Sequence, residues 1–145
     1  MSDEQTMELL TSQGHGVLSL ASDDSAYGFP ISFGYDDADD RFLFEFLSVG
    51  QSKKSAFVDA TAEATLTVYD FEDQRTWESA IVTGTVEPVD AAALSERTVA
   101  SVSRQSDDGA AGLQYEEADG LERQWYELRP TSVTGRYSTV DDPSN

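Results

Sequence analysis

Two adjacent lysines are the residues of this chain that most clearly suggest chemistry. Lys53 and Lys54 are its only lysines, although the chain carries 28 acidic residues. They stand at the start of a predicted short helix, whose electropositive end disfavours cations by roughly 0.3 kcal/mol or more. An anion shared between the lysines and the free backbone N–H groups of the first turn would reverse that penalty. Ser48, Gln51 and Ser52 add hydrogen-bond donors, so the segment predicts a site for a phosphate-bearing ligand.

The alternative is that both lysines form ion pairs with surface carboxylates. Such pairs contribute about 0–1 kcal/mol each even in dilute salt, and they do not explain why the two lysines are adjacent. In molar salt a charge acts only at contact distance, so lysines kept there are expected to touch a ligand directly. We therefore favour the anion site.

The composition is strongly acidic. Nine basic and 28 acidic residues give a formal net charge of −19, and self-repulsion of that size strains a compact protein in dilute salt. In molar salt the Debye length falls to about 3 Å, so repulsion between separated carboxylates nearly vanishes. The acidic residues are scattered in short groups along the chain. We interpret them as a surface adapted to a cell that accumulates salt, and we expect no binding to nucleic acid, which requires a basic surface.

Two other interpretations of the acidic residues are a surface that mimics DNA and a calcium-binding loop at residues 36–40. A calcium loop needs a central glycine and a closing glutamate. The run from Asp36 to Asp40 has neither. Salt adaptation is therefore the interpretation that we favour.

The sequence also bears on compartment and metal binding. No apolar run approaches the roughly 18 residues of a membrane span, and Asp3 and Glu4 stand where a secretory signal would be basic. The chain has no cysteine and a single histidine, His15, so we expect neither a disulfide nor a metal site. Between two glycines, His15 is expected to fill a turn, with acid–base chemistry as the alternative. We expect a cytoplasmic protein without a membrane partner.

Hydrophobic periodicity predicts one mainly β domain over residues 1–137, followed by a frayed tail at residues 138–145. The predicted strands cover residues 17–21, 29–35, 42–47, 64–69, 77–86 and 123–128, the last continuing weakly to residue 137. Pro30 indicates a bulge or an unpaired position in the second strand. Gly84 indicates a bulge or a close approach in the fifth. The pattern is typical of a six-stranded antiparallel barrel with peripheral helices, and a plain β-sandwich is the alternative.

Three short helices are predicted around these strands. Ser2 and Gln5 form a potential capping box for a helix at residues 3–13, which Gly14 would end. Ser52 would cap a helix that follows the third strand. Another helix would begin near Asp90 and carry Ala91, Leu94, Thr98 and Val102 on one face. Residues 105–120 are predicted to form a loop.

The chain resembles the flavin-binding split-barrel superfamily in its predicted order of a helix, a strand and a hairpin. The resemblance continues through the segment Phe42-Leu43-Phe44-Glu45-Phe46-Leu47-Ser48-Val49-Gly50-Gln51-Ser52-Lys53-Lys54. That superfamily contains pyridoxamine-phosphate oxidase and nitroimidazole-reductase-like proteins. The fifth strand, Trp77 to Glu87 with its Gly-x-x-Glu ending, is similar as well. With its acidic surface, the chain looks like a haloarchaeal-type member. The resemblance covers about residues 5–90 well and the C-terminal third in outline.

The resemblance implies a homodimer with flavin mononucleotide (FMN) in each of two clefts between the subunits. Ser52, Lys53 and Lys54 match the positions that hold the phosphate. The ring would lie along Pro30, Ile31, Ser32 and Phe33, with Phe46, Leu47 and Ser48 nearby and Gln51 as a further donor. Ser79 would reach the cofactor of the other subunit.

Departures from the family pattern limit what the resemblance implies about activity. The oxidase's Arg-x-x-x-Leu-Lys motif is replaced by Phe29-Pro30-Ile31-Ser32-Phe33-Gly34, and its substrate-binding Arg and His near the C-terminus are not recognisable. A histidine common in nitroimidazole-reductase-like members is replaced by Glu45 or Phe46. The resemblance thus implies binding of the cofactor but does not identify a substrate. We expect a flavin-dependent oxidoreductase that uses NAD(P)H and an unidentified small acceptor. The alternatives are a deazaflavin-dependent reductase of the same fold and a non-enzymatic flavin or ligand binder.

Overall fold

The computed structural model describes residues 2–49, 53–105 and 121–138. For residues 46–49, 53–55, 102–105 and 121–123 it describes the backbone alone. Gly50, Gln51 and Ser52 therefore lie outside the described residues, as do nearly all of the predicted loop and the predicted tail.

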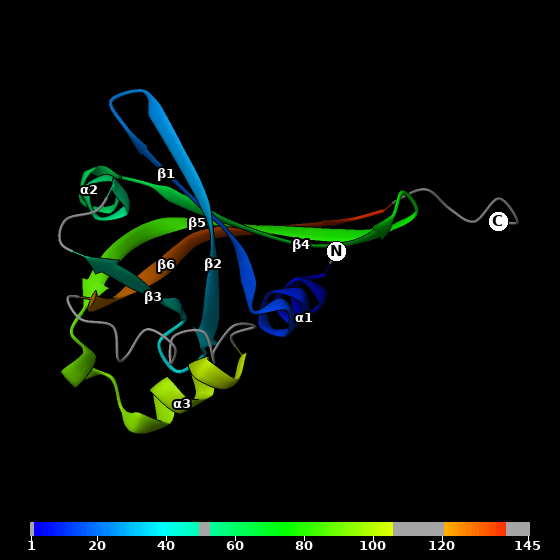
Figure 1. Ribbon diagram of the computed structural model, residues 1–145. Coiled ribbons are helices and arrows are strands. Elements are labelled where there is room, and N and C mark those ends of the chain that lie inside the picture. Colours follow the sequence, from blue (N-terminus) through cyan, green and yellow to red (C-terminus); the bar gives the residue numbers. More distant parts are fainter. Residues whose placement is uncertain (1, 50–52, 106–120, 139–145) are drawn as a thin grey trace, which may run out of the picture.

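Six antiparallel strands close into a barrel in the order β1-β2-β3-β6-β5-β4, which confirms the predicted fold (Figure 1). The strands are β1 (His15–Ser22), β2 (Ser25–Asp36), β3 (Arg41–Val49), β4 (Ala64–Asp73), β5 (Thr76–Val89) and β6 (Leu121–Tyr137). The helical elements are α1 (Asp3–Gln13), α2 (Lys53–Ala60), the 3₁₀ turn η1 (Ala91–Ala93) and α3 (Glu96–Gln105). Leucine, valine and phenylalanine side chains from the inner face of every strand fill the barrel.

Helix α1 forms by the local chemistry that its sequence predicts. Gln5 N–H donates to Ser2 Oγ at 3.1 Å, and the Ser2 N–H donates to the Gln5 side chain at 2.9 Å, which completes the capping box. Gly14 ends the helix in the left-handed conformation, with φ of 69°. Leu9 and Leu10 on this helix are buried in the barrel core.

The strands β4, β5 and β6 extend together beyond the barrel as a long arm (Figure 1). The pairing of β5 with β6 shifts register at Thr83/Gly84, which confirms the predicted bulge. A Cβ at Gly84 would lie 2.0 Å from the Arg129 carbonyl oxygen, so only glycine fits there. Pro130 pairs opposite Gly84 within this irregularity, and β6 runs through the proline as one strand.

The single helix predicted from Asp90 onward is wrong. Leu94 is extended, with φ −91° and ψ 130°, and separates η1 from α3. Ser95 begins the second helix by accepting the N–H of Thr98 at 3.0 Å. The break lets Leu94 pack against Leu43 and Val89 on the outside of the barrel. The helical spacing of apolar residues that predicted one helix is therefore produced by two short elements, η1 and α3.

None of the helices in the described part of the chain has the length and apolar character needed to cross a membrane.

Candidate functional site

The barrel is split where β2 and β3 separate. β2 pairs with β1 from Ser25 to Ser32, but its pairing with β3 covers only Phe33 to Asp36. Beyond Phe44, β3 continues along β6 as far as Val49. Among the described strands, the β3-facing edge of β2 therefore carries no ladder before Phe33. Exposed strand edges present backbone groups that are available to a ligand.

The direction of the backbone groups at this split follows from one hydrogen bond. Phe33 N–H donates to the Gly14 carbonyl at 3.0 Å, toward the β1 side. Backbone N–H groups alternate between the two edges of a strand, so the Ser32 N–H and the Pro30 nitrogen point to the other edge. Proline is tolerated there because no ladder bond is lost. Within the described strands, the Ser32 N–H is therefore a donor that points to the edge of β2 without a β3 partner.

The four predicted ring-contact residues of β2 divide between its two faces. The side chains of Pro30 and Ser32 lie on the outer face and are at least partly exposed. Ile31 packs against the core. Phe33 is 1% exposed and lies edge-to-face on Phe42 at 5.8 Å, so its side chain belongs to the barrel interior.

Helix α2 follows β3 directly and is fixed to the β1–β2 hairpin. The ring of Phe57 lies 5.3 Å from that of Tyr27, and Val58 is buried in the core. Thr61, just after the helix, donates to the Ala21 carbonyl and accepts the Ala21 N–H, each at 3.2 Å. These contacts fix the C-terminal half of α2 to the β1–β2 hairpin and to the barrel core.

Several predicted site residues have no described side chain. The backbones of Phe46, Leu47 and Ser48 pair with β6, opposite Gln124, Arg123 and Glu122 respectively. Lys53 and Lys54 form the first turn of α2, where no acidic residue occurs. Their side chains, and the whole of Gln51 and Ser52, lie outside the described part of the chain, so the phosphate site stays a prediction.

One part of the outer face of the sheet carries no described carboxylate, although the chain is strongly acidic and the same strands carry Asp36, Glu87 and Glu127 farther along. Strand pairing across β2, β1, β4, β5 and β6 places one alternating set of side chains on this face. We call it the carboxylate-free face. Its members are His15, Val17, Ser19, Ala21, Ala26, Gly28, Pro30, Ser32, Thr65, Thr67, Tyr69, Phe71, Trp77, Ser79, Ile81, Thr83, Ser132, Thr134 and Arg136.

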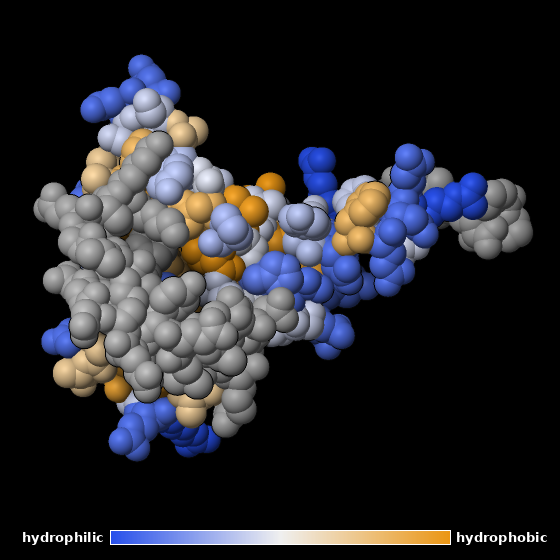
Figure 2. Space-filling model, in the orientation of Figure 1, coloured by the Kyte–Doolittle hydropathy of each residue, from blue (hydrophilic) through white to orange (hydrophobic). Residues whose placement is uncertain are grey.

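Every member of the carboxylate-free face is at least partly exposed. Tyr69 is 57% exposed, Phe71 59% and Ile81 42%. Figure 2 shows orange and pale atoms where the strands leave the barrel, and blue atoms at the tip of the β1–β2 hairpin, toward the lower edge and along the arm. A surface selected only for hydration would carry acidic groups here as elsewhere. Exposed apolar side chains gathered on one face are typical of a surface that a ligand or a partner covers.

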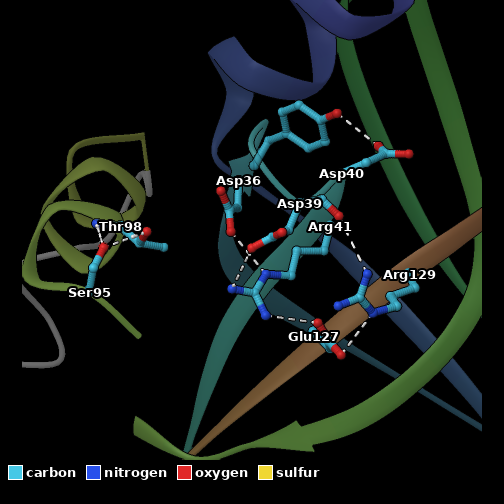
Figure 3. A network of polar contacts seen from close by, with 9 residues as sticks. Asp36, Asp39, Asp40, Arg41, Ser95, Thr98, Glu127 and Arg129 are labelled. Carbon is cyan, nitrogen blue, oxygen red and sulfur yellow. Dashed lines mark hydrogen bonds and ion pairs between the residues drawn. The ribbon is translucent and has the colours of Figure 1, made fainter. Parts of the chain in front are cut away.

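An ion-pair network fixes the closed end of the β2–β3 hairpin onto β6 (Figure 3). Arg41 Nε lies 2.9 Å from Asp36, Nη1 3.0 Å from Glu127 and Nη2 3.4 Å from Asp39. Glu127 also accepts from Arg129 Nε at 3.0 Å. Burial alone would lower the pKa of Arg41, but its hydrogen bonds with Glu127 and Asp36 raise it. The network sets where β2 and β3 are held together, and hence where they separate.

The acidic turn beside this network also perturbs a tyrosine. The Tyr35 hydroxyl donates to Asp40 at 2.8 Å. Burial, then this hydrogen bond and the charges of the turn, raises the pKa of Tyr35 to about 12. Within the turn at residues 37–40, Asp40 accepts from Tyr35 and Asp39 pairs with Arg41, so two of the carboxylates interpreted as hydrated surface also stabilise the turn.

The architecture and the sequence agree with one protein family. The model of the family described as pyridoxamine 5'-phosphate oxidase matches residues 2–137. This chain belongs to that family. Among curated proteins, none matches the sequence significantly.

Solved structures with the same fold include three whose descriptions name a cofactor. An FAD-binding protein from Mesorhizobium loti has a TM-score of 0.71 and 20% identity, covering 96% of this chain and 95% of that one. The FAD-binding protein from Mycobacterium smegmatis has a TM-score of 0.62 and 22% identity, covering 95% and 96%. An FAD- and heme-binding protein from Mycobacterium smegmatis has a TM-score of 0.69 and 18% identity, covering 99% and 75%. At these identities the likeness shows the fold alone.

Sequence reasoning missed one feature of this family member's candidate site. His15 begins β1 and lies directly opposite Ser32 on the carboxylate-free face. Its Nδ1 lies 3.1 Å from the Gln13 carbonyl oxygen. The prediction that His15 fills a turn is wrong, because His15 is the first residue of β1. The sequence alone does not give the register of β1 against β2, so it could not place His15 opposite Ser32.

Proposed function

We propose that this member of the pyridoxamine 5'-phosphate oxidase family binds FMN and passes electrons from a nicotinamide donor to a small acceptor. The observation that carries the proposal is the split between β2 and β3, where the Ser32 N–H is directed to the edge of β2 that β3 does not pair with. The isoalloxazine ring would lie over Pro30 and Ser32. Lys53 and Lys54, in the first turn of α2, would hold the phosphate.

The chemistry of the described residues fits such a cofactor. FMN is an anion, and the carboxylate-free face offers it no repulsive group. FMN would supply the redox chemistry, while the protein supplies binding, orientation and electrostatics. The Ser32 N–H would donate to the ring, and Pro30 and Val17 would give it an apolar surface. Phe46, Leu47, Ser48, Gln51 and Ser52 complete the proposed site.

A second flavin, FAD, is favoured by the descriptions of two structural neighbours as FAD-binding proteins. Two further alternatives keep the fold: a deazaflavin-dependent reductase and a non-enzymatic flavin or ligand binder. The deazaflavin coenzyme has a longer acidic tail and would need more cations than Lys53 and Lys54. Turnover of NAD(P)H with a visible acceptor distinguishes an enzyme from a binder.

Adding FMN to the protein in molar potassium chloride is expected to shift and sharpen the flavin absorption bands. The double variant Lys53→Ala/Lys54→Ala is expected to bind FMN at least tenfold more weakly, about 1.4 kcal/mol. The reason is that contact between the ammonium groups and the phosphate survives screening by salt. Spectral titration of both proteins measures the effect.

Riboflavin and an arginine variant serve as controls for the titration. Riboflavin lacks the phosphate, so the lysine substitutions should leave its affinity nearly unchanged. Arg97→Gln removes an exposed cation of α3, outside the site, and should leave FMN affinity unchanged. Equal FMN affinity in the wild type and the double variant would sink the phosphate assignment. Flavins that stay spectrally unperturbed would discard the flavin proposal.

We further propose that the carboxylate-free face is the interface of a homodimer, with the flavin in the cleft between the subunits. The exposed Tyr69, Phe71 and Ile81 support this proposal, because large apolar side chains gather on a face without acidic groups. Ser79 on the same face would reach the partner's cofactor. The remaining proposals are adaptation to molar salt, as in a haloarchaeal-type member, and a cytoplasmic location.

Ile81→Glu is expected to convert the dimer to a monomer in molar potassium chloride. Ile81 lies between Thr67 and Thr134 near the middle of the face, and an unpaired charge buried in an interface is strongly unfavourable. Light scattering measures the molar mass. Ala100→Glu, on exposed α3, adds the same charge elsewhere and should leave the dimer intact. A wild-type monomer, or a dimeric Ile81→Glu variant, would contradict the interface.

A further inference from the structure

Arg136 is the only arginine or lysine on the carboxylate-free face. It lies on β6 directly opposite Ser79, which in turn lies opposite Tyr69 on β4. The Arg136 side chain is exposed and forms no ion pair with any described residue. Arg41 and Arg129, by contrast, are both held by Glu127.

Among the described residues, no carboxylate shares the face that Arg136 occupies, which is unusual in so acidic a chain. The acidic residues of the same part of the arm are Asp70 and Glu78. In the strand register Asp70 lies opposite Glu78, and Glu78 lies opposite Tyr137. Because side chains alternate along a strand, these carboxylates lie on the opposite face from Arg136. The register thus places the guanidinium on the opposite face from the described carboxylates of the arm and leaves it available for an external anion.

The surroundings of Arg136 suit an oxyanion attached to an apolar body. The hydroxyl groups of Ser79, directly opposite, and of Thr134, two residues earlier on the same face, are further hydrogen-bond donors. Trp77 and Ile81 flank Ser79 along β5 and offer apolar contact. Guanidinium binds carboxylate and phosphate through two parallel hydrogen bonds, which act at contact distance and persist in salt.

We propose that Arg136 binds the carboxylate or phosphate group of a small ligand that lies on the carboxylate-free face. Since Ser79 beside it is assigned to the flavin cleft, this ligand is the substrate, and the substrate is an anion. That last step rests on the proposed function. The anion site itself rests only on the register, the exposed guanidinium and the hydroxyl groups around it.

Benzoate and phenyl phosphate are the probes, with neutral benzamide as the matched control for benzoate. Calorimetric titrations are made in molar potassium chloride, on the flavin-free protein and again with FMN added. Wild type is expected to bind one of the anions more tightly than benzamide. Arg136→Gln should lower that affinity at least tenfold, about 1.4 kcal/mol, while Arg136→Lys should lower it less and Arg97→Gln should not change it. The better anion identifies the oxyanion as carboxylate or phosphate.

Three results would overturn the proposal. The first is equal binding of the anions and benzamide. The second is equal loss of affinity in Arg136→Gln and Arg97→Gln. The third is a wild type that binds neither anion while Arg136→Gln loses its dimer, which would show that Arg136 pairs with a partner's carboxylate. The anions are titrated on the flavin-free protein, so their binding is measured whether or not FMN binds. FMN binding is likewise measured whether or not the anions bind.

Discussion

Replacing Arg41 by glutamine is expected to lower the free energy of unfolding by about 3 kcal/mol. The Arg41 side chain is 12% exposed and joins Asp36 and Glu127, whose side chains are 6% and 9% exposed. Removing the cation leaves two nearly buried carboxylates with fewer hydrogen bonds. Their negative charges then repel each other without the guanidinium between them. An unpaired buried charge is far more costly than the net gain of the original pair.

The same substitution at Arg129 provides the matched control. Arg129 also binds Glu127 at 3.0 Å, but its side chain is 51% exposed. An exposed pair contributes about 0–1 kcal/mol, so Arg129→Gln should have a small effect. Urea unfolding in molar potassium chloride, followed by circular dichroism, gives both free energies. Equal losses in the two variants would show that burial of the Arg41 pairs does not matter.

A second variant separates the charge from the packing of the Arg41 side chain. Adding Glu127→Gln to Arg41→Gln removes one of the two carboxylates that lost the Arg41 cation and should recover part of the lost stability. A coupling of about 1 kcal/mol or more between the two sites is expected for residues in direct contact. Purely additive losses would place the effect in side-chain packing rather than in the ion pair.

Sequence reasoning succeeds where structure is determined by neighbouring residues. The capping box of Ser2 and Gln5 and the stop at Gly14 are local hydrogen-bond chemistry, and the structure has both. It fails at Leu94, where the apolar spacing of one helix is produced by a 3₁₀ turn and a separate helix. The sequence does contain a sign of the second helix, because Ser95 is a residue type that favours the N-cap position. In the structure Ser95 caps α3 by accepting the N–H of Thr98.

The candidate site is harder to predict because it depends on register. Nothing local in the sequence places Ser79 opposite Arg136, or His15 opposite Ser32, because these pairs join residues far apart in the chain. The carboxylate-free face exists only once five strands are aligned. Arg136 alone is an exposed residue near the C-terminus, and Pro30 alone indicates only an unpaired strand position. The strands could be predicted, whereas the surface that they create together could not.

Transfer from molar potassium chloride to dilute buffer is expected to destabilise the protein by several kcal/mol. Two unit charges 10 Å apart in water repel by roughly 0.4 kcal/mol, and a net charge of −19 places many carboxylates at such distances. The Debye length grows from about 3 Å at 1 M salt to about 10 Å at 0.1 M, so this repulsion returns on dilution. The sum is comparable with the whole stability of a domain, about 5–15 kcal/mol.

Thermal unfolding followed by circular dichroism across this salt range measures the effect. The matched variant neutralises four exposed carboxylates, Asp23→Asn, Asp24→Asn, Asp37→Asn and Asp59→Asn. Asn accepts the positive φ of 48° and 66° at the first two positions. The variant should melt at a higher temperature than wild type in dilute buffer and at nearly the same temperature in molar salt. Equal melting of the two proteins in dilute buffer would mean that the acidic surface serves a purpose other than salt adaptation, such as imitation of DNA.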